Sequence, residues 1–87
     1  MKLFKLIVST PKGNVLEKDA VMLSVRGTEG SLAVMAGHIP FITSVVKCTC
    51  TLWLPDGIKK TASTEGGLLT VSSNEVTFVS GSFKLND

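Results

Sequence analysis

The sequence has few of the side chains that build catalytic and metal sites, with one histidine and two cysteines among 87 residues. Cys48 and Cys50 are one residue apart, so on a strand both side chains lie on one face and a disulfide between them would distort the backbone. A single C-x-C pair with one distant histidine also lacks the spacing of a zinc site. We therefore expect unbridged thiols in a reducing compartment, no metal and no cofactor.

Charged and aromatic residues are also scarce, at 18% and 6% of the chain, and the net charge is only +2. A single-strand-binding barrel needs a basic groove with aromatic rings for stacking, but the only adjacent basic pair is Lys59-Lys60. The mean hydropathy of +0.35 suggests apolar surface that another subunit covers. We expect no nucleic-acid partner, while a stand-alone small β-barrel module for single-stranded nucleic acid or another ligand remains the alternative.

Long apolar runs are absent, because Lys, Ser, Gly or Pro interrupts each one before it reaches the length of a membrane helix. No small-residue cleavage site follows a clean apolar block near Met1, so no signal peptide is predicted. The length fits one small domain, residues 1–87, with a modest core. We expect a protein of the cytoplasm.

Short runs of Val, Ile, Thr and Phe separated by Gly, Pro, Asn and Asp dominate the chain and indicate β-structure. The predicted strands cover residues 3–8, 15–18, 21–26, 31–35, 41–46, 48–54, 58–64, 68–71 and 76–79. Pro55-Asp56-Gly57 predicts a hairpin turn, and residues 83–87 are expected to form a frayed tail. Because no helical periodicity extends over three turns, the pattern predicts a β-sandwich or barrel.

Glycine and proline mark the expected turns. The segment Gly27-Thr28-Glu29-Gly30 predicts a turn, while Gly37 and Pro40 interrupt the strand pattern between residues 35 and 41. Gly66-Gly67 allows a bend or a close approach of two backbones. The glycine-rich stretches lack the lysine and the following helix of a phosphate-binding loop.

No catalytic constellation is recognisable. His38 is the only histidine, and no G-x-S-x-G motif places a nucleophile beside a base. The carboxylates fall mostly in predicted turns and at strand ends, where solvated side chains are expected. The sequence therefore predicts a protein that is not itself an enzyme.

Residues 25–40 read V-R-G-T-E-G-S-L-A-V-M-A-G-H-I-P. This segment resembles the pattern V-x-G-x-E-G-x-[LF]-x-[VI]-x-x-G-H-x-P of the epsilon subunit of F-type ATP synthases. Two further segments, V-S-T-P at residues 8–11 and G-G-L-L-T-V followed by N-E-V-T at residues 66–77, resemble other parts of that family. The resemblance runs from about Leu3 to Ser80, in the family's order.

The resemblance implies an all-β fold, a flattened β-sandwich of about ten short, mostly antiparallel strands in two sheets. In that family the domain is a non-catalytic part of the central stalk, or rotor. It packs on the gamma subunit and on the membrane c-ring, and it couples proton or sodium passage to ATP synthesis. The expected location is the cytoplasmic face of the bacterial inner membrane, reached only through the complex.

The resemblance also assigns contact residues. The turn Glu29-Gly30-Ser31-Leu32 matches the loop that faces the c-ring. Thr10, His38 and Thr43 match positions on or near the gamma and c-ring surfaces, and we assign them to the gamma interface. The residues also allow plainer interpretations: the glycines as turn formers, His38 as a stabiliser of the turn before Pro40, and the threonines as ordinary surface residues.

The sequence departs from the family pattern in several places. Ser31 stands where an acidic residue is common, and Ala33 and Ala36 replace a common Gly and Pro. Lys47-Cys48-Thr49 replaces Lys-Pro-Gly, which predicts continuous strand in place of a turn. Relatives usually continue into two antiparallel helices that in some bacteria bind ATP or inhibit hydrolysis. Because the sequence ends at Asp87, we expect a natural short form without this helical hairpin, its inhibition or its ATP binding. A trimmed piece of a longer chain is the alternative.

Overall fold

The structure, a computed structural model, describes residues 2–86 as strands joined by short turns, with one 3₁₀ turn, η1 (Pro55–Gly57). The strands are β1 (Phe4–Thr10), β2 (Gly13–Ala20), β3 (Met22–Gly27), β4 (Gly30–Met35), β5 (Phe41–Val45), β6 (Cys48–Trp53), β7 (Lys59–Thr64), β8 (Gly67–Val71), β9 (Glu75–Ser80) and β10 (Phe83–Asn86).

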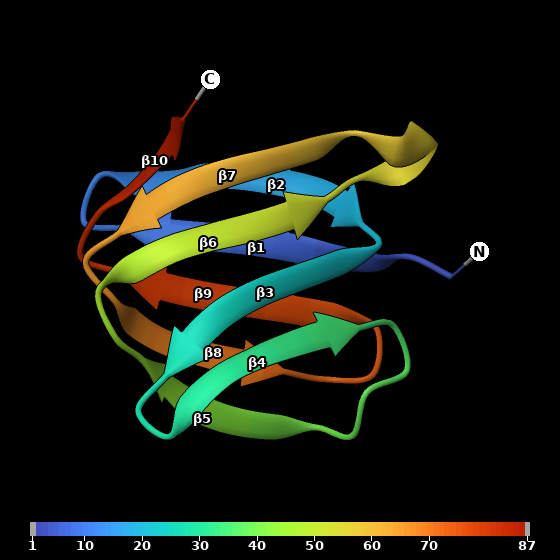
Figure 1. The fold of residues 1–87 in the computed structure, drawn as a ribbon, viewed down its shortest axis with the longest axis horizontal. Helices are drawn as coiled ribbons and strands as arrows, with labels where there is room; N and C mark the ends of the chain where they lie inside the picture. The colour runs from blue at the N-terminus through green and yellow to red at the C-terminus, as the bar shows by residue number, and fades with distance from the viewer. Residues whose placement is uncertain (1, 87) are drawn as a thin grey trace.

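The strands form two layers (Figure 1). Hydrogen bonds link β10, β7, β6, β3 and β4 in the front layer, and β5, β8, β9, β1 and β2 in the back layer. The layers are joined at the end of β3, where Gly27 pairs with Val45 of β5, so one sheet folds over on itself. The pairs are antiparallel except for β1 with β9. The prediction of a flattened sandwich of about ten mostly antiparallel strands is confirmed.

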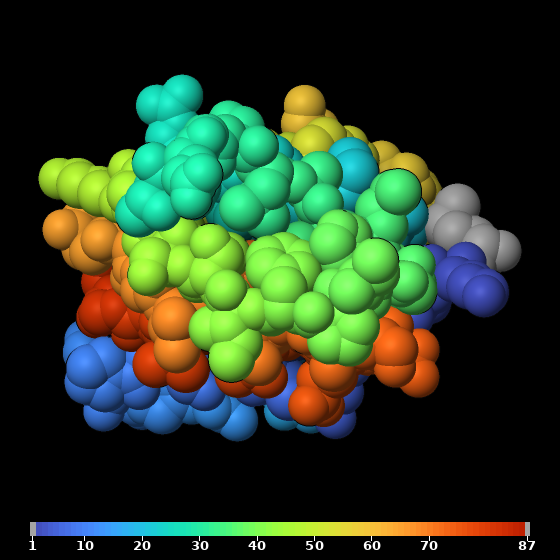
Figure 2. Space-filling view, turned by 90° about the horizontal axis from the view of Figure 1, so that it is seen from below, coloured from blue at the N-terminus to red at the C-terminus, as the bar shows by residue number. Residues whose placement is uncertain are grey.

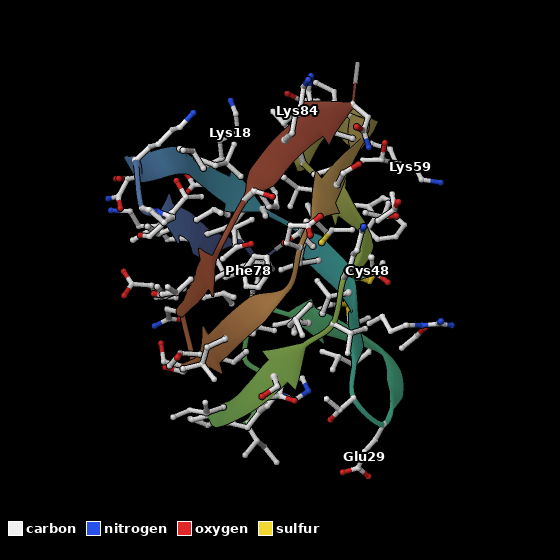
Figure 3. All side chains as sticks on the ribbon, turned by 90° about the vertical axis from the view of Figure 1, so that its left-hand side faces the viewer. Lys18, Glu29, Cys48, Lys59, Phe78 and Lys84 are labelled. Atoms are coloured by element: carbon white, nitrogen blue, oxygen red, sulfur yellow. The ribbon has the colours of Figure 1, made fainter. Side chains whose placement is uncertain are left out.

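The core forms because successive side chains of a strand point to opposite faces, and several strands carry apolar residues at every second position. In β1, for example, Phe4, Leu6 and Val8 are buried, while Lys5 is exposed. Figure 3 shows Phe78 between the two layers, where it is 1% exposed. The largest fully buried side chains are Phe4, Phe78, Leu6, Leu23, Leu69, Val8, Val34, Val76 and Cys50.

The hairpin between β6 and β7 turns where the sequence predicts. Asp56 and Gly57 have positive φ values of 70° and 75°, which glycine adopts readily and aspartate tolerates. The turn is closed by a hydrogen bond from the Leu54 amide to the Ile58 carbonyl, 2.8 Å long. Lys59 then places its ammonium 5.6 Å from the centre of the Trp53 ring, so this cation lies over an aromatic face.

The turn between β7 and β8 brings two backbones into close approach. Gly66 has φ = 97°, and a Cβ atom on Gly67 would collide with the Val79 carbonyl oxygen. Beside this turn, the buried hydroxyls of Thr64 and Ser80 lie 2.7 Å apart, and Ser80 donates to the Gly66 carbonyl. These hydrogen bonds satisfy buried polar atoms that would otherwise cost about 1–3 kcal/mol each.

The prediction of a frayed tail at residues 83–87 is wrong for the residues described. Phe83–Asn86 form β10, which pairs with β7 from Phe83 opposite Thr64 onward. The Phe83 ring also meets Phe78 edge to face, with centroids 6.1 Å apart. The partners of this four-residue strand lie far away in the sequence, so its local pattern gave no signal. Asp87 lies outside the described residues.

The prediction of continuous strand through Lys47-Cys48-Thr49 is also wrong. β5 ends at Val45, the chain bends at Lys47, and β6 begins at Cys48. β5 and β6 belong to different layers, so the chain must leave one ladder before it enters the other. The amide of Val46 donates to the Arg26 carbonyl, 3.0 Å away, and fixes this crossing.

A core truncation tests this packing. Phe78→Ala should lower the free energy of unfolding by about 3–5 kcal/mol, because it removes a fully buried ring and leaves a cavity. The neighbouring Val79 is 52% exposed, so Val79→Ala should cost less than about 1 kcal/mol. Equal losses for the two variants in urea denaturation would contradict the assignment of the inner face.

Candidate functional site

The segment expected to face the c-ring is the tip of the β3–β4 hairpin. Gly27 and Gly30 pair across the tip, and Gly30 has φ = 126°, which a side chain would strain. Glu29 projects from the tip (Figure 3), and Gly30 and Ser31 are also exposed. Leu32 is half-buried and packs against the core. The hairpin therefore presents a polar tip on an apolar anchor.

His38 lies in the loop between β4 and β5. Its ring packs against Phe41 with centroids 5.0 Å apart, and Nδ1 lies 2.9 Å from the Ile39 carbonyl oxygen. A carbonyl only accepts, so the hydrogen bond requires the proton on Nδ1. The Gly37 amide donates to the Ser73 carbonyl in the β8–β9 turn. His38 thus stabilises a loop that leaves Ile39 79% exposed.

Thr10 lies at the other end of the molecule. It ends β1, and its hydroxyl accepts a hydrogen bond from the Lys12 amide in the β1–β2 turn. With Val15 and Phe83 it helps to line a cavity of about 190 Å³. Figure 1 shows the β1–β2 turn at the left end and the β4–β5 loop at the right end. The structure therefore does not bring Thr10 and His38 together.

Thr43 lies within β5, on the inner side of the back layer. It is half-buried and pairs with Leu69, whose side chain is completely buried. Its neighbours Ile42 and Ser44 point outward and are exposed, Ile42 to 66%. A partner on the outer surface of β5 would therefore contact Ile42 and Ser44 before Thr43.

The outer face of the back layer carries a group of uncharged side chains that we call the apolar face. Its most exposed hydrophobic members are Ile42, Leu68 and Val79. The register aligns Leu68 between Ser44 and Val79, so the exposed positions of β5, β8 and β9 are contiguous. Figure 2 shows β5 with β8 and β9 beside it along one edge of the molecule. The members are Ile7, Ser9, Ile42, Ser44, Leu68, Thr70, Thr77 and Val79.

The sequence analysis did not identify the apolar face. The available signal was the presence of Ile42, Leu68 and Val79 at positions where strand alternation calls for polar residues. The high mean hydropathy indicated apolar surface without locating it. The register between distant strands was needed to show that these positions adjoin.

Charged side chains lie at the margin of the apolar face. Lys5 of β1 forms a 3.1 Å ion pair with Glu17 of β2, and both side chains are about half exposed. The hydrogen bond and the charge of Glu17 raise the pKa of Lys5. Such an exposed pair contributes little stability, because water and salt screen the two charges. Its position separates the apolar face from the charged outer edge of the back layer.

Most aromatic rings lie in the core or pack against it. Phe4 and Phe78 are buried, and Phe41 and Phe83 pack against the core. Trp53 is half-buried beneath Lys59. Residues 2–86 therefore offer no row of exposed rings for base stacking.

Within the described part of the chain, no three His, Cys, Asp or Glu side chains gather to hold a metal ion. No helix formed by these residues has the length and apolarity to span a membrane.

The two cysteines are free and share the inner face of β6, as the alternation predicts. Cys50 is 1% exposed, and Cys48 is half-buried. Burial raises the pKa of Cys50 to about 12, assisted by the charge and hydrogen bond of Cys48. Cys50 therefore stays a neutral thiol near neutral pH and acts as a small core residue.

Comparison with known proteins finds a matching family and several relatives. A family model described as "ATP synthase, Delta/Epsilon chain, beta-sandwich domain" matches residues 3–85. The ATP synthase epsilon chain of Bacillus velezensis is 35% identical over 79 residues, which cover 91% of this chain and 59% of the relative. The sodium ion specific ATP synthase epsilon chain of Acetobacterium woodii is 33% identical over 72 residues, covering 83% and 54%. The chain thus spans less than two thirds of the curated relatives' length.

The fold is also shared with solved structures. A chain in the Euglena gracilis mitochondrial ATP synthase superimposes with a TM-score of 0.91 at 17% identity, over 98% of this chain and 54% of that one. A chain from the central stalk and c-ring of the Tetrahymena thermophila mitochondrial ATP synthase gives 0.78 at 13% identity, over 92% and 64%. At these identities the likeness establishes the fold.

The contrast between the cysteines can be measured by thiol reactivity. At pH 8 a pKa of about 12 leaves roughly one Cys50 thiol in ten thousand ionised. In a Cys48→Ala variant, Cys50 should therefore react with a disulfide reagent only after denaturation. In Cys50→Ala, the half-buried Cys48 should react in the native state. Fast native labelling of Cys50 would contradict its burial.

A pH titration of stability gives a second readout of the same group. A raised thiol pKa stabilises the fold fully below the unfolded value, near 9.0, and this contribution is lost as pH rises toward about 12. Wild type should therefore lose more stability than Cys50→Ala between pH 9 and 12. Parallel losses in the two proteins would contradict the raised pKa.

Proposed function

Because this chain belongs to the family of ATP synthase delta/epsilon β-sandwich domains, we propose that it is a non-catalytic central-stalk subunit of an F-type ATP synthase. It joins the gamma subunit to the membrane c-ring and couples ion translocation to ATP synthesis. The observation that carries this proposal is the family match across residues 3–85, and the apolar face supplies a surface for a partner. Residues 1–87 act as a single β-sandwich domain.

The gamma subunit binds across the apolar face in this proposal. This face exposes Ile42 to 66%, Leu68 to 46% and Val79 to 52%. The side chains between them carry hydroxyl groups and no charge. The centres of protein interfaces are depleted of charge, as this face is. An apolar surface shared by β5, β8 and β9 is costly in water and is stabilised when a partner covers it.

Of the residues first assigned to gamma, Thr10 and His38 flank the apolar face from opposite ends. Thr10 directly follows Ser9 in β1, and the His38 loop leads into β5. They therefore act at the rim of the interface, with His38 holding the loop that exposes Ile39. Thr43 supports Ile42 from the inner side of the layer.

The c-ring contacts the tip of the β3–β4 hairpin, residues 29–32. The tip is exposed and polar and projects from the end of the sandwich, which suits contact with polar loops. Glu29 supplies the carboxylate of this tip, because position 31, where an acidic residue is common in the family, is a serine. Leu32 anchors the hairpin to the core, so the tip moves with the whole domain.

Location and coupling ion follow from the complex. We place the subunit at the cytoplasmic face of a bacterial inner membrane, held there by gamma and the c-ring. The relatives include a chain described as sodium ion specific and others without that description. The proposal therefore covers either protons or sodium ions as the coupling ion.

Gamma binding tests the main proposal. The cognate gamma subunit should capture the chain, and Val79→Asp should weaken capture at least about tenfold, because it buries an unpaired charge. Thr49→Asp adds the same charge on an exposed position of β6 in the other layer and should leave capture unchanged. Folding of each variant is checked by circular dichroism and thermal denaturation.

Two results would contradict the assignment. If folded wild-type chain and folded gamma do not associate, the central-stalk proposal fails. If Val79→Asp binds as well as Thr49→Asp, gamma binds elsewhere and only the choice of face is wrong.

The hairpin assignment has its own test. Glu29→Gln should weaken binding of the chain–gamma complex to c-rings by about two- to tenfold, the range for one exposed polar or charged contact. The loss should shrink at high salt, since screening already weakens the wild-type contact. Glu75→Gln removes an exposed carboxylate from the start of β9 and serves as the control. Equal c-ring binding by all three proteins would remove Glu29 from the interface.

A further inference from the structure

The front layer opens where β3 separates from β6. The β3–β6 ladder runs from Met22 opposite Trp53 to Ser24 opposite Thr51 and then stops. Beyond it, β3 next pairs on this side with β5, at Gly27. The β5–β6 connection crosses the intervening space, which forms a cavity of about 350 Å³. This volume lies at the lower end of the range, about 300–1,000 Å³, typical of small-molecule sites.

The polar side chains that line this cavity are cations and hydroxyls. Its lining residues are Ser24, Val25, Arg26, Ser31, Lys47, Cys48 and Thr49. They include two cations and three hydroxyls and no carboxylate. Arginine and lysine only donate hydrogen bonds, and hydroxyls can donate as well. A cavity lined in this way is complementary to an oxyanion and does not suit a cation.

Neither Arg26 nor Lys47 is held in a strong ion pair, so both can bind a ligand. Among residues 2–86, Arg26 forms no ion pair within 4.0 Å. Lys47 has a carboxylate partner, Glu65, at 3.8 Å, but the two side chains are 78% and 60% exposed. Such a long, solvated pair is weak, so an anion in the cavity can compete for Lys47.

We propose that this cavity binds a phosphate group, with Arg26 and Lys47 as its cations and the hydroxyls of Ser24, Ser31 and Thr49 as further donors. Arginine matches the phosphate oxygens with its planar fork of donors, and lysine adds a point charge. Two sources share this chemistry: a soluble phosphate compound and the headgroup of an anionic phospholipid.

The position of the cavity links it to the hairpin. Ser31 pairs with Arg26 across β3 and β4, and it also belongs to the exposed hairpin tip. Figure 3 shows Cys48, a lining residue, and Glu29, at the tip, on the same side of the molecule. A phosphate bound here therefore adds negative charge close to the tip that we assign to the c-ring.

The test is a titration of ¹⁵N-labelled chain with potassium phosphate at constant ionic strength, followed by the amide resonances. Saturable shifts are expected for residues 24–26, 31 and 47–49. Arg26→Gln and Lys47→Gln should each weaken binding about tenfold, the loss expected for one charge-assisted contact. Lys59→Gln removes an exposed lysine from β7 and should bind phosphate as wild type does.

Several results would overturn the site. They are shifts that grow without saturation, shifts that potassium chloride reproduces, or equal affinity of wild type and Lys47→Gln. Because Lys47 is highly exposed, its variant keeps the test valid if Arg26→Gln fails to fold. None of these readouts needs gamma or the c-ring, so failure here is distinct from failure of the central-stalk proposal.

A second arm identifies the source of the phosphate. Flotation with vesicles of phosphatidylglycerol, compared with phosphatidylcholine, should recover wild type and lose Arg26→Gln and Lys47→Gln if the ligand is a headgroup. Saturable binding of free phosphate without vesicle binding assigns a soluble compound.

Discussion

The fold depends on one strand that serves both layers. β3 pairs with β4 along its whole length, with β6 over its first half and with β5 at Gly27. This junction lets a single hydrogen-bonded sheet fold back and close its apolar side chains inside. A sheet of this size needs such closure, because a chain of 87 residues has a small core and no disulfide to support it. The hairpin tip, the β5 end at Val45 and the cavity lined by Arg26 and Lys47 all lie around the junction.

The same construction separates the surfaces that we assign to different partners. The apolar face lies on the back layer, and the hairpin tip projects from the end of the front layer. Both belong to strands that share one core, and Leu32 ties the tip to that core. Close-packed side chains and hydrogen-bonded strands connect the two surfaces and deform little. The central-stalk role that we propose requires this stiffness, because the domain would then transmit force between two partners.

Buried polar groups near the β7–β8 turn are all hydrogen-bonded. Thr64 and Ser80 share a short hydrogen bond beneath Gly66, and no buried side-chain polar atom of the described residues lacks a partner. Next to them, β10 extends the front layer and brings Phe83 against Phe78. This corner is where the sequence was least informative, because its contacts join residues from three separate strands. Each strand segment alone is too short to specify them.

The sequence by itself determined the fold class, most strand positions and the family resemblance. Alternation and turn residues act locally, so the Pro55-Asp56-Gly57 hairpin and the shared face of Cys48 and Cys50 could be predicted. Only the tertiary structure decided that Ile42, Leu68 and Val79 form one exposed face, that Thr43 points inward, and that Arg26 and Lys47 meet at one cavity. These facts depend on register and on the point where β3 leaves β6 for β5. Such pairings between distant strands are set by packing of the whole core and leave little trace in the local pattern.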